Sequence, residues 1–274
     1  MKKPDCRAGG EALAQWRGPG PRNESSWECA LTAKASAGVN AIPDGLASGM
    51  RLKLTQYGEI VVGLTGDNLA GLSAYGDGLN GTPPVVASVL VVHNVDLRQL
   101  RLIAERGPTL GNLGITAPVV MTPAYIEQSL DTFPLEMMEI HQRNVCVSGD
   151  DYFASIEIQN EHLRLQCERE LKRILIRLRQ GALAAGGRED ILAEIGADIG
   201  LHIVRTVRGL LWLRNERSFL PMEQAISAAS GLIGGPLSGA ARAIRPSGAS
   251  EWSDFETLYA DVERLASYVD QMND

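Results

Sequence analysis

The stretch from Gly71 to Asn94, GLSAYGDGLNGTPPVVASVLVVHN, has residue types and a spacing suited to phosphate chemistry. Two apolar runs flank a glycine-rich turn, which indicates a strand, a tight turn and a second strand. Small residues in such a turn let backbone N–H groups approach a phosphate closely. Acidic residues that hold a metal ion usually follow, yet no Asp or Glu stands between Asp77 and Asp96. The stretch therefore predicts a phosphate-binding turn without its metal ligands.

A second candidate site lies further along the chain, where His141 follows Glu136 and Glu139. A histidine with two carboxylates can bind a metal or exchange protons near neutral pH, although such residues also fall close together by chance. His93, at the end of the second apolar run, is interpreted either as a ligand contact or as a solvated strand end. His202 falls on the apolar stripe of a predicted helix, so we interpret it as a core residue.

A set of basic residues gathers on one predicted helix. Three glutamates are interleaved with them, so a solvated helix face explains the set, and contact with an anion in a cleft between domains is the alternative. The chain has no P-loop, no GxSxG, no HExxH and no platform of basic and aromatic residues for nucleic acid. The set comprises Arg164, Arg169, Lys172, Arg173, Arg177 and Arg179.

Composition and charge narrow the classes of partner. Of the 274 residues, 45% are apolar and 22% charged, and the net charge is -7. A mildly acidic chain has no overall field that attracts nucleic acid or an anionic membrane, and no apolar run is long enough to span a bilayer. The four cysteines are far apart, which is typical of reduced thiols in a cytoplasmic protein. We therefore expect a cytoplasmic protein with neither nucleic acid nor membrane as its partner. These cysteines are Cys6, Cys29, Cys146 and Cys167.

The elements that must position these residues begin after a Gly-, Ser- and Pro-rich segment, 1–50, which we expect to be flexible. Residues 51–65 fit a helical face, although Val61-Val62 also suits a strand; we favour a helix that stops at Gly66. Pro118 interrupts the third apolar run, which places that strand at a sheet edge. Periodicity predicts the following elements: strands at 69–75, 85–92, 115–122 and 143–151, a helix over 97–106, and a short helix from Pro123.

From about residue 160 the pattern becomes helical. We predict helices over about 160–187, 188–214, 221–233 and 253–272, with a loop at 234–250. Ser253 and Glu256 have the spacing of a capping box at the start of the last helix. Four helices of this kind suggest a bundle. The predicted organisation is a flexible segment at 1–50, an α/β domain at 51–158 and a helical bundle domain at 159–274.

The order of these elements resembles the nucleotidyltransferase superfamily of the DNA polymerase beta type, in its small bacterial branch with an added helical domain. The likeness covers about residues 51–215 and implies a mixed sheet with flanking helices, followed by a four-helix bundle. Its motifs are short, and their order along the chain carries the resemblance. These motifs are Tyr75-Gly76 after the first strand, Thr122-Pro123, Phe133-Pro134-x-Glu136, Gly149-Asp150 and the helix RLQCEREL.

In that family a Gly-Ser pair holds the nucleoside triphosphate, an Asp-x-Asp pair binds Mg²⁺, and a carboxylate on a later strand completes the site. These groups neutralise charge and align the attacking oxygen during phosphoryl transfer. Here Gly76 matches the glycine, but Asp77 replaces the serine and repels a triphosphate. Val86 and Ser88 occupy the metal-binding positions. Glu136 is the candidate third carboxylate, or else an exposed acid at a strand edge.

The resemblance therefore implies a nucleotidyltransferase-like protein that is catalytically inactive or strongly weakened. Gly76, Asp77 and Ser88 are the expected contacts to a bound nucleotide or other ligand, and no metal ligand carries over. Such a protein acts as a ligand-binding or protein-interaction module, with another protein or a second copy of itself as partner. The alternative is an active enzyme that uses Mg²⁺ and transfers a nucleotide from an NTP to a small molecule or a protein side chain. That enzyme needs an unorthodox site built from Asp77, Glu136 or His141.

Overall fold

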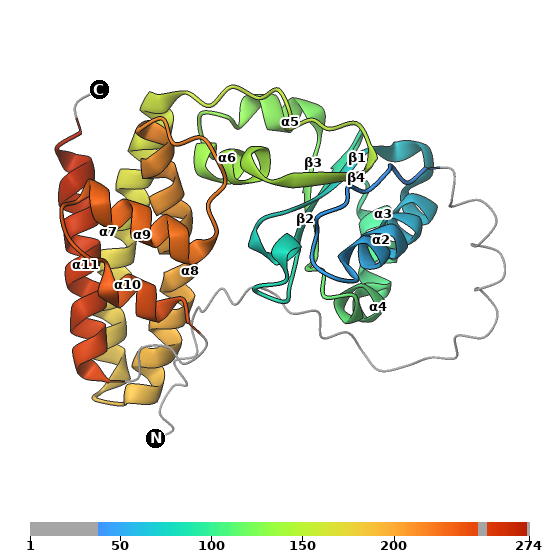
Figure 1. Ribbon diagram of the computed structural model, residues 1–274. Helices are drawn as coiled ribbons and strands as arrows, with labels where there is room; N and C mark the ends of the chain where they lie inside the picture. The colour runs from blue at the N-terminus through green and yellow to red at the C-terminus, as the bar shows by residue number, and fades with distance from the viewer. Residues whose placement is uncertain (1–37, 246–250, 273–274) are drawn as a thin grey trace, which may run out of the picture. The chain divides into compact units, whose positions relative to one another are not determined.

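The computed structural model describes residues 38–245 and 251–272, which form a mixed α/β structure with one four-stranded mixed sheet and ten α-helices (Figure 1). They fall into two compact units. The sheet unit holds the chain up to Ala124 together with Asn144–Tyr152, and the helical unit holds Tyr125–Arg143 together with the chain from Phe153 onward. The expected boundary at residue 158 differs from this division, because the segment 125–143 belongs to the helical unit.

Helix α2 (Met50–Thr65) confirms the helix favoured for this segment. Leu54, Tyr57 and Val61 follow one another at helical spacing and are buried in the core of the sheet unit. Burying each such side chain contributes about 1.5–3 kcal/mol. Gly66, with a φ of 52°, ends the helix as the sequence predicts.

The sheet consists of β1 (Leu69–Tyr75), β2 (Ala87–Val92), β3 (Val119–Met121) and β4 (Asn144–Gly149), in the order β3-β2-β1-β4. Strand β1 is antiparallel to β2 and β4, and β2 is parallel to β3. Helices α3 (Leu97–Glu105) and α4 (Gly107–Asn112) connect β2 to β3. The edge position predicted for the strand after Pro118 is confirmed. Asp96 caps α3, since its side chain accepts a hydrogen bond from the backbone N–H of Arg98 at 2.8 Å.

The predicted flexible segment, 1–50, lies outside the described residues up to residue 37. The remainder, 38–49, is described and contacts β4 and the core of the sheet unit. Val39 forms a bridge with Ser148, and the backbone N–H of Asn40 donates to the carbonyl of Val147 at 2.7 Å. Ile42 is buried in the core of the sheet unit.

The helical unit is built around three long helices that pack against one another (Figure 1). They are α7 (Asn160–Ala185), α8 (Glu189–Leu213) and α11 (Trp252–Asp270), and their facing apolar side chains form one cluster. The predicted helix over 221–233 is confirmed as α9 (Met222–Leu232). The remaining helices are α5 (Pro123–Gln128), α6 (Pro134–Gln142) and α10 (Ser238–Ala243). Helix α5 begins in the sheet unit, which ends at Ala124, and continues into the helical unit.

Two local predictions for the C-terminal region are wrong. The segment 234–250, predicted as a loop, contains α10. The capping box is absent, because α11 begins one residue earlier than predicted and Glu251 is its N-cap without a capping bond. Ser253 instead donates to the Glu251 carboxylate at 3.4 Å, and Glu256 accepts from the indole N–H of Trp252 at 2.9 Å. No helix in the described ranges combines the length and hydropathy needed to cross a bilayer.

Candidate functional site

The glycine-rich turn reverses the chain between β1 and β2. Gly76 has φ 84° and ψ -166°, a conformation that essentially only glycine adopts. A short 3₁₀ helix, Asp77–Asn80, follows it. A Cβ atom on Gly78 would lie 2.2 Å from the carbonyl oxygen of Val85, so the turn folds back closely on the residues before β2. Both glycines are thus required by the backbone path.

The two positions implied as metal ligands lie inside the core. Val86 and Ser88 are each 1% exposed. Val86 belongs to the same apolar cluster as Leu79. The Ser88 hydroxyl bonds the phenol of Tyr57 at 2.9 Å and donates to the carbonyl of Thr116 at 3.3 Å. Burial raises the pKa of Tyr57, so the phenol stays neutral. Ser88 is therefore inaccessible to a nucleotide, and the Val86 position cannot hold a hydrated cation.

The opposite face of the sheet supplies no alternative carboxylate ligands for a metal ion. Side chains alternate between faces along a strand, so a shift of one residue in the alignment selects this face instead. Mg²⁺ requires hard oxygen ligands, chiefly carboxylates and water. None of the strand residues that alternate onto this face at the turn end of β1, β2 and β4 is a carboxylate. They are Ser73, Tyr75, Ala87, Val89, Asn144 and Cys146.

Asp77 is an acidic residue of this turn, and it is partly buried at the first position of the 3₁₀ helix. Across the residues that the structure describes, no group of three or more His, Cys, Asp or Glu side chains is placed to hold a metal ion. A single carboxylate leaves most of the charge on a triphosphate and its metal uncompensated. The turn thus has a closely constrained backbone, and the described residues supply no set of metal ligands to it.

Glu136 lies in the first turn of α6, not on a strand, and it belongs to the helical unit, whereas Gly76 and Asp77 belong to the sheet unit. Its carboxylate accepts a hydrogen bond from Gln166 at 2.7 Å and pairs with Arg205 at 3.4 Å. The interpretation of Glu136 as a strand-edge acid is therefore wrong. Its contacts join α6 to α7 and α8 and give it a structural role.

His141 does not form one site with Glu136 and Glu139. On a helix, residues two apart point to nearly opposite sides. Glu139 accepts a hydrogen bond from Arg205 of α8 at 2.8 Å. His141 bonds the carbonyl of Phe153 through Nδ1 at 2.7 Å and contacts the edge of the Trp212 ring. The predicted acid/base or metal cluster is thus divided between two faces of α6.

His202 is half-buried among charged groups of α7 and α8 rather than fully in the core. Burial lowers its pKa and nearby Arg205 lowers it further; Asp198, Arg177 and Glu170 have smaller effects. The folded protein therefore binds a proton at His202 less readily than the unfolded chain does. The stability from this group is complete above pH 6.5 and is lost as the pH falls.

We expect the free energy of unfolding, measured by urea denaturation, to decrease between about pH 7.5 and pH 5. His202→Gln should remove part of this slope, because the uncharged side chain cannot take up a proton. His93→Gln is the matched control, since His93 is exposed at the end of β2. If the two variants have the same pH profile, His202 does not contribute to the slope.

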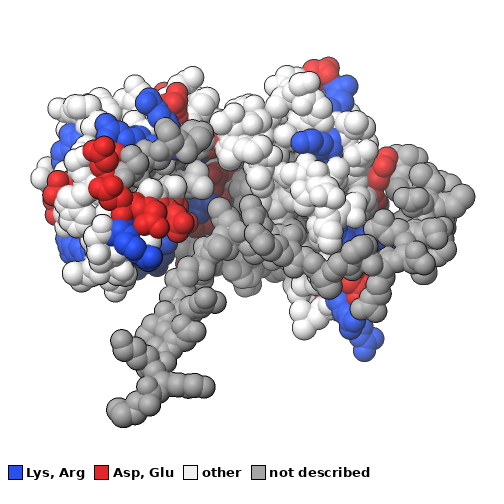
Figure 2. Space-filling view, turned by 90° about the horizontal axis from the view of Figure 1, so that it is seen from below, with Lys and Arg blue, Asp and Glu red and all other residues white. Residues whose placement is uncertain are grey.

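The basic residues of α7 pair mainly with neighbouring acids of α7, α8 and α11. Figure 2 shows Lys and Arg interspersed with Asp and Glu on the visible face of the helical unit, at the left. Such pairs at a surface contribute little to stability. These pairs include Arg164–Glu168, Lys172–Glu168, Lys172–Asp270, Arg173–Glu170 and Arg177–Asp198.

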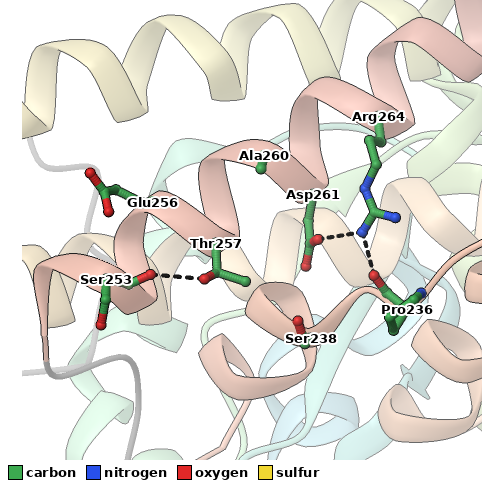
Figure 3. A pocket seen from close by; sticks show the side chains of 8 residues that line it. All are labelled: Pro236, Ser238, Ser253, Glu256, Thr257, Ala260, Asp261 and Arg264. Carbon is green, nitrogen blue, oxygen red and sulfur yellow. Dashed lines mark hydrogen bonds and ion pairs between the residues drawn. The ribbon is translucent and has the colours of Figure 1, made fainter.

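An open cavity of about 590 Å³ lies where α10 meets α11 (Figure 3). Asp261 is almost fully buried there, and its carboxylate accepts from the backbone N–H groups of Gly239 and Ala240 at 2.7 and 3.0 Å. Arg264 donates to Asp261 at 2.6 Å and also to the carbonyl of Pro236. Asp261 therefore binds the start of α10 and Arg264 binds the residue Pro236 before it, which gives both side chains a structural role. No local pattern predicts this contact, because it joins residues more than 20 positions apart.

Comparisons of the chain with protein-family models, with curated proteins and with solved structures find no match.

Proposed function

We propose that the chain is a nucleotidyltransferase-like protein that is catalytically inactive or strongly weakened, and that it acts as a ligand-binding or protein-interaction module. On this proposal the sheet unit is a degenerate nucleotidyltransferase core and the helical unit is the added bundle. The order α2, β1, turn, β2, α3, β3 in the sheet unit supports the proposal, because it is the order that the sequence resemblance implies.

The burial of Val86 and Ser88 is the main observation in support of a loss of catalysis. Both positions are 1% exposed and are surrounded by core residues. Mg²⁺ keeps several waters when it binds a protein and needs carboxylates within about 2.1 Å. An apolar core offers neither water nor carboxylates, so it cannot neutralise the charge that develops during phosphoryl transfer.

An active enzyme with an unorthodox site is less well supported. Glu136 is bonded to Gln166 and Arg205, and His141 is bonded to Phe153. Asp77 remains as one carboxylate at the turn, and one carboxylate is a poor substitute for three.

Incubation of the full chain with each NTP and Mg²⁺, with pyrophosphate release as the readout, tests the proposal. We expect no release above a protein-free control, and the same result for Glu136→Ala and Glu136→Gln. Release that requires Mg²⁺ and is abolished in both variants would show that catalysis survives.

A further inference from the structure

Helix α7 has an outward face that the described parts of α8 and α11 leave exposed. Arg177 pairs with Asp198 on the α8 side, and Lys172 pairs with Asp270 on the α11 side, so these two ion pairs bound the face. Two aliphatic side chains lie on it, although a solvated helix normally exposes polar groups there. The residues of this face are Arg169, Arg173, Ile176, Gln180 and Leu183.

The spacing of this face suits contact with another helix. Its residues are separated by four, three, four and three positions, which is the repeat of a helix–helix seam. Ile176 is 53% exposed and Leu183 is 85% exposed, one heptad apart. A shallow groove of about 540 Å³ runs along the first part of this seam. It is lined by Arg169, Lys172, Arg173, Ile176, Arg177 and Gln180.

The groove is basic. Four of its six lining residues are cations and none is a carboxylate. The acids that pair with them, such as Glu170 and Asp198, lie beside the groove and not in it. Within the described ranges Arg169 has no carboxylate within ion-pair distance. The groove therefore combines an aliphatic side chain, Ile176, with a cationic lining in which Lys172, Arg173 and Arg177 also pair with acids beside the groove.

We propose that this groove binds an acidic amphipathic helix of a partner protein. Recognition of a helix in a groove uses apolar anchors at helical spacing, and Ile176 and Leu183 provide the surface for such anchors. Carboxylates beside the anchors of the partner helix meet Arg169 and Arg173, which provides charge complementarity. Pairing of α7 with α7 of a second copy is disfavoured, because it brings the same cations together. This inference depends on the proposed function in one respect, because it names the partner that the proposed interaction module binds.

The test uses the full chain and a synthetic, fluorescently labelled helical peptide with leucine at its seam positions and glutamate beside them. We expect saturable binding by fluorescence anisotropy that weakens as salt rises. Ile176→Asp should weaken binding by about tenfold, as loss of an interface anchor does, and Arg173→Glu should weaken it and reduce its salt dependence. Leu201→Asp, which changes an exposed leucine on α8 outside the groove, is the matched control. Circular dichroism and thermal unfolding establish that each variant is folded.

Four outcomes would overturn the inference. The first is that the acidic peptide does not bind, and the second is that a peptide with lysine in place of glutamate binds equally well. The third is that Ile176→Asp and Arg173→Glu leave binding unchanged. The fourth is that the protein binds anionic vesicles or RNA instead of the peptide. Self-association through this face, detected by light scattering and lost in Ile176→Asp, would assign the groove to a second copy. Peptide binding together with Mg²⁺-dependent transfer would refute the proposed function and leave this inference standing, so the two can fail separately.

Discussion

Val86→Asp should destabilise the protein strongly and should not create a magnesium site. Val86 is 1% exposed and belongs to the same apolar cluster as Leu79, Leu110 and Ile115. An aspartate there is buried either as an unpaired charge or as a neutral acid without a hydrogen-bond partner, and each is costly. We expect the free energy of unfolding, measured by urea denaturation, to fall by about 4 kcal/mol or more, with no recovery when Mg²⁺ is added.

Val85→Asp is the matched control, because it introduces the same residue one position earlier, where the side chain is 43% exposed. Its cost should be within about 0.5 kcal/mol. If Val86→Asp is as stable as this control, or if Mg²⁺ restores its stability, the position is an open metal site and the interpretation of the core is wrong.

Asp261→Ala should produce the second large loss of stability, of about 3–5 kcal/mol. The substitution leaves the N–H groups of Gly239 and Ala240 without an acceptor and leaves Arg264 without its buried partner. Helix α10 has six residues and depends on contacts of this kind, because a helix so short is not stable alone. Thermal unfolding followed by circular dichroism measures the loss.

Glu263→Ala removes an exposed carboxylate from the same helix and should change stability by no more than about 0.5 kcal/mol. A cost below about 1 kcal/mol for Asp261→Ala would show that α10 is held by its apolar contacts and that the carboxylate is dispensable.

The sequence predicts the elements whose periodicity is strong. The stripe of Leu54, Tyr57 and Val61 identifies α2, and Gly66 marks its end. Pro118 identifies the edge strand, because proline cannot donate a hydrogen bond to a ladder. Long amphipathic patterns likewise identify α7, α8 and α11.

Elements that depend on distant contacts could not be predicted in this way. Helix α10 has a weak local pattern and is fixed by Asp261, which is more than 20 residues away. Helix α6 did carry a signal, since Pro134 stands at its first turn, where proline is favoured. A helix at this point excludes a strand-edge position for Glu136 and places His141 and Glu139 on different sides of the helix.

The candidate site could be predicted from the sequence only in part, because some of its features depend on contacts between distant residues. The lack of acids between Asp77 and Asp96 is visible in the sequence and does not depend on the fold. The burial of Ser88 against Tyr57 is not visible, because the two residues meet only when α2 packs on the sheet. The outward face of α7 was recognised as basic, but Ile176 and Leu183 could be placed on it only once the neighbours of α7 were known.

Thermal unfolding of the full chain with each NTP, in the presence and absence of Mg²⁺, tests directly whether the protein lacks a site for a nucleotide with its metal ion. A ligand that binds the folded state at a hundredfold excess over its Kd raises stability by about 2.7 kcal/mol, so specific binding is easily detected. We expect that Mg²⁺ adds nothing to the shift given by any NTP, because Val86 and Ser88 leave no place for the ion. A shift that appears only with Mg²⁺ and disappears with a chelator would contradict this expectation.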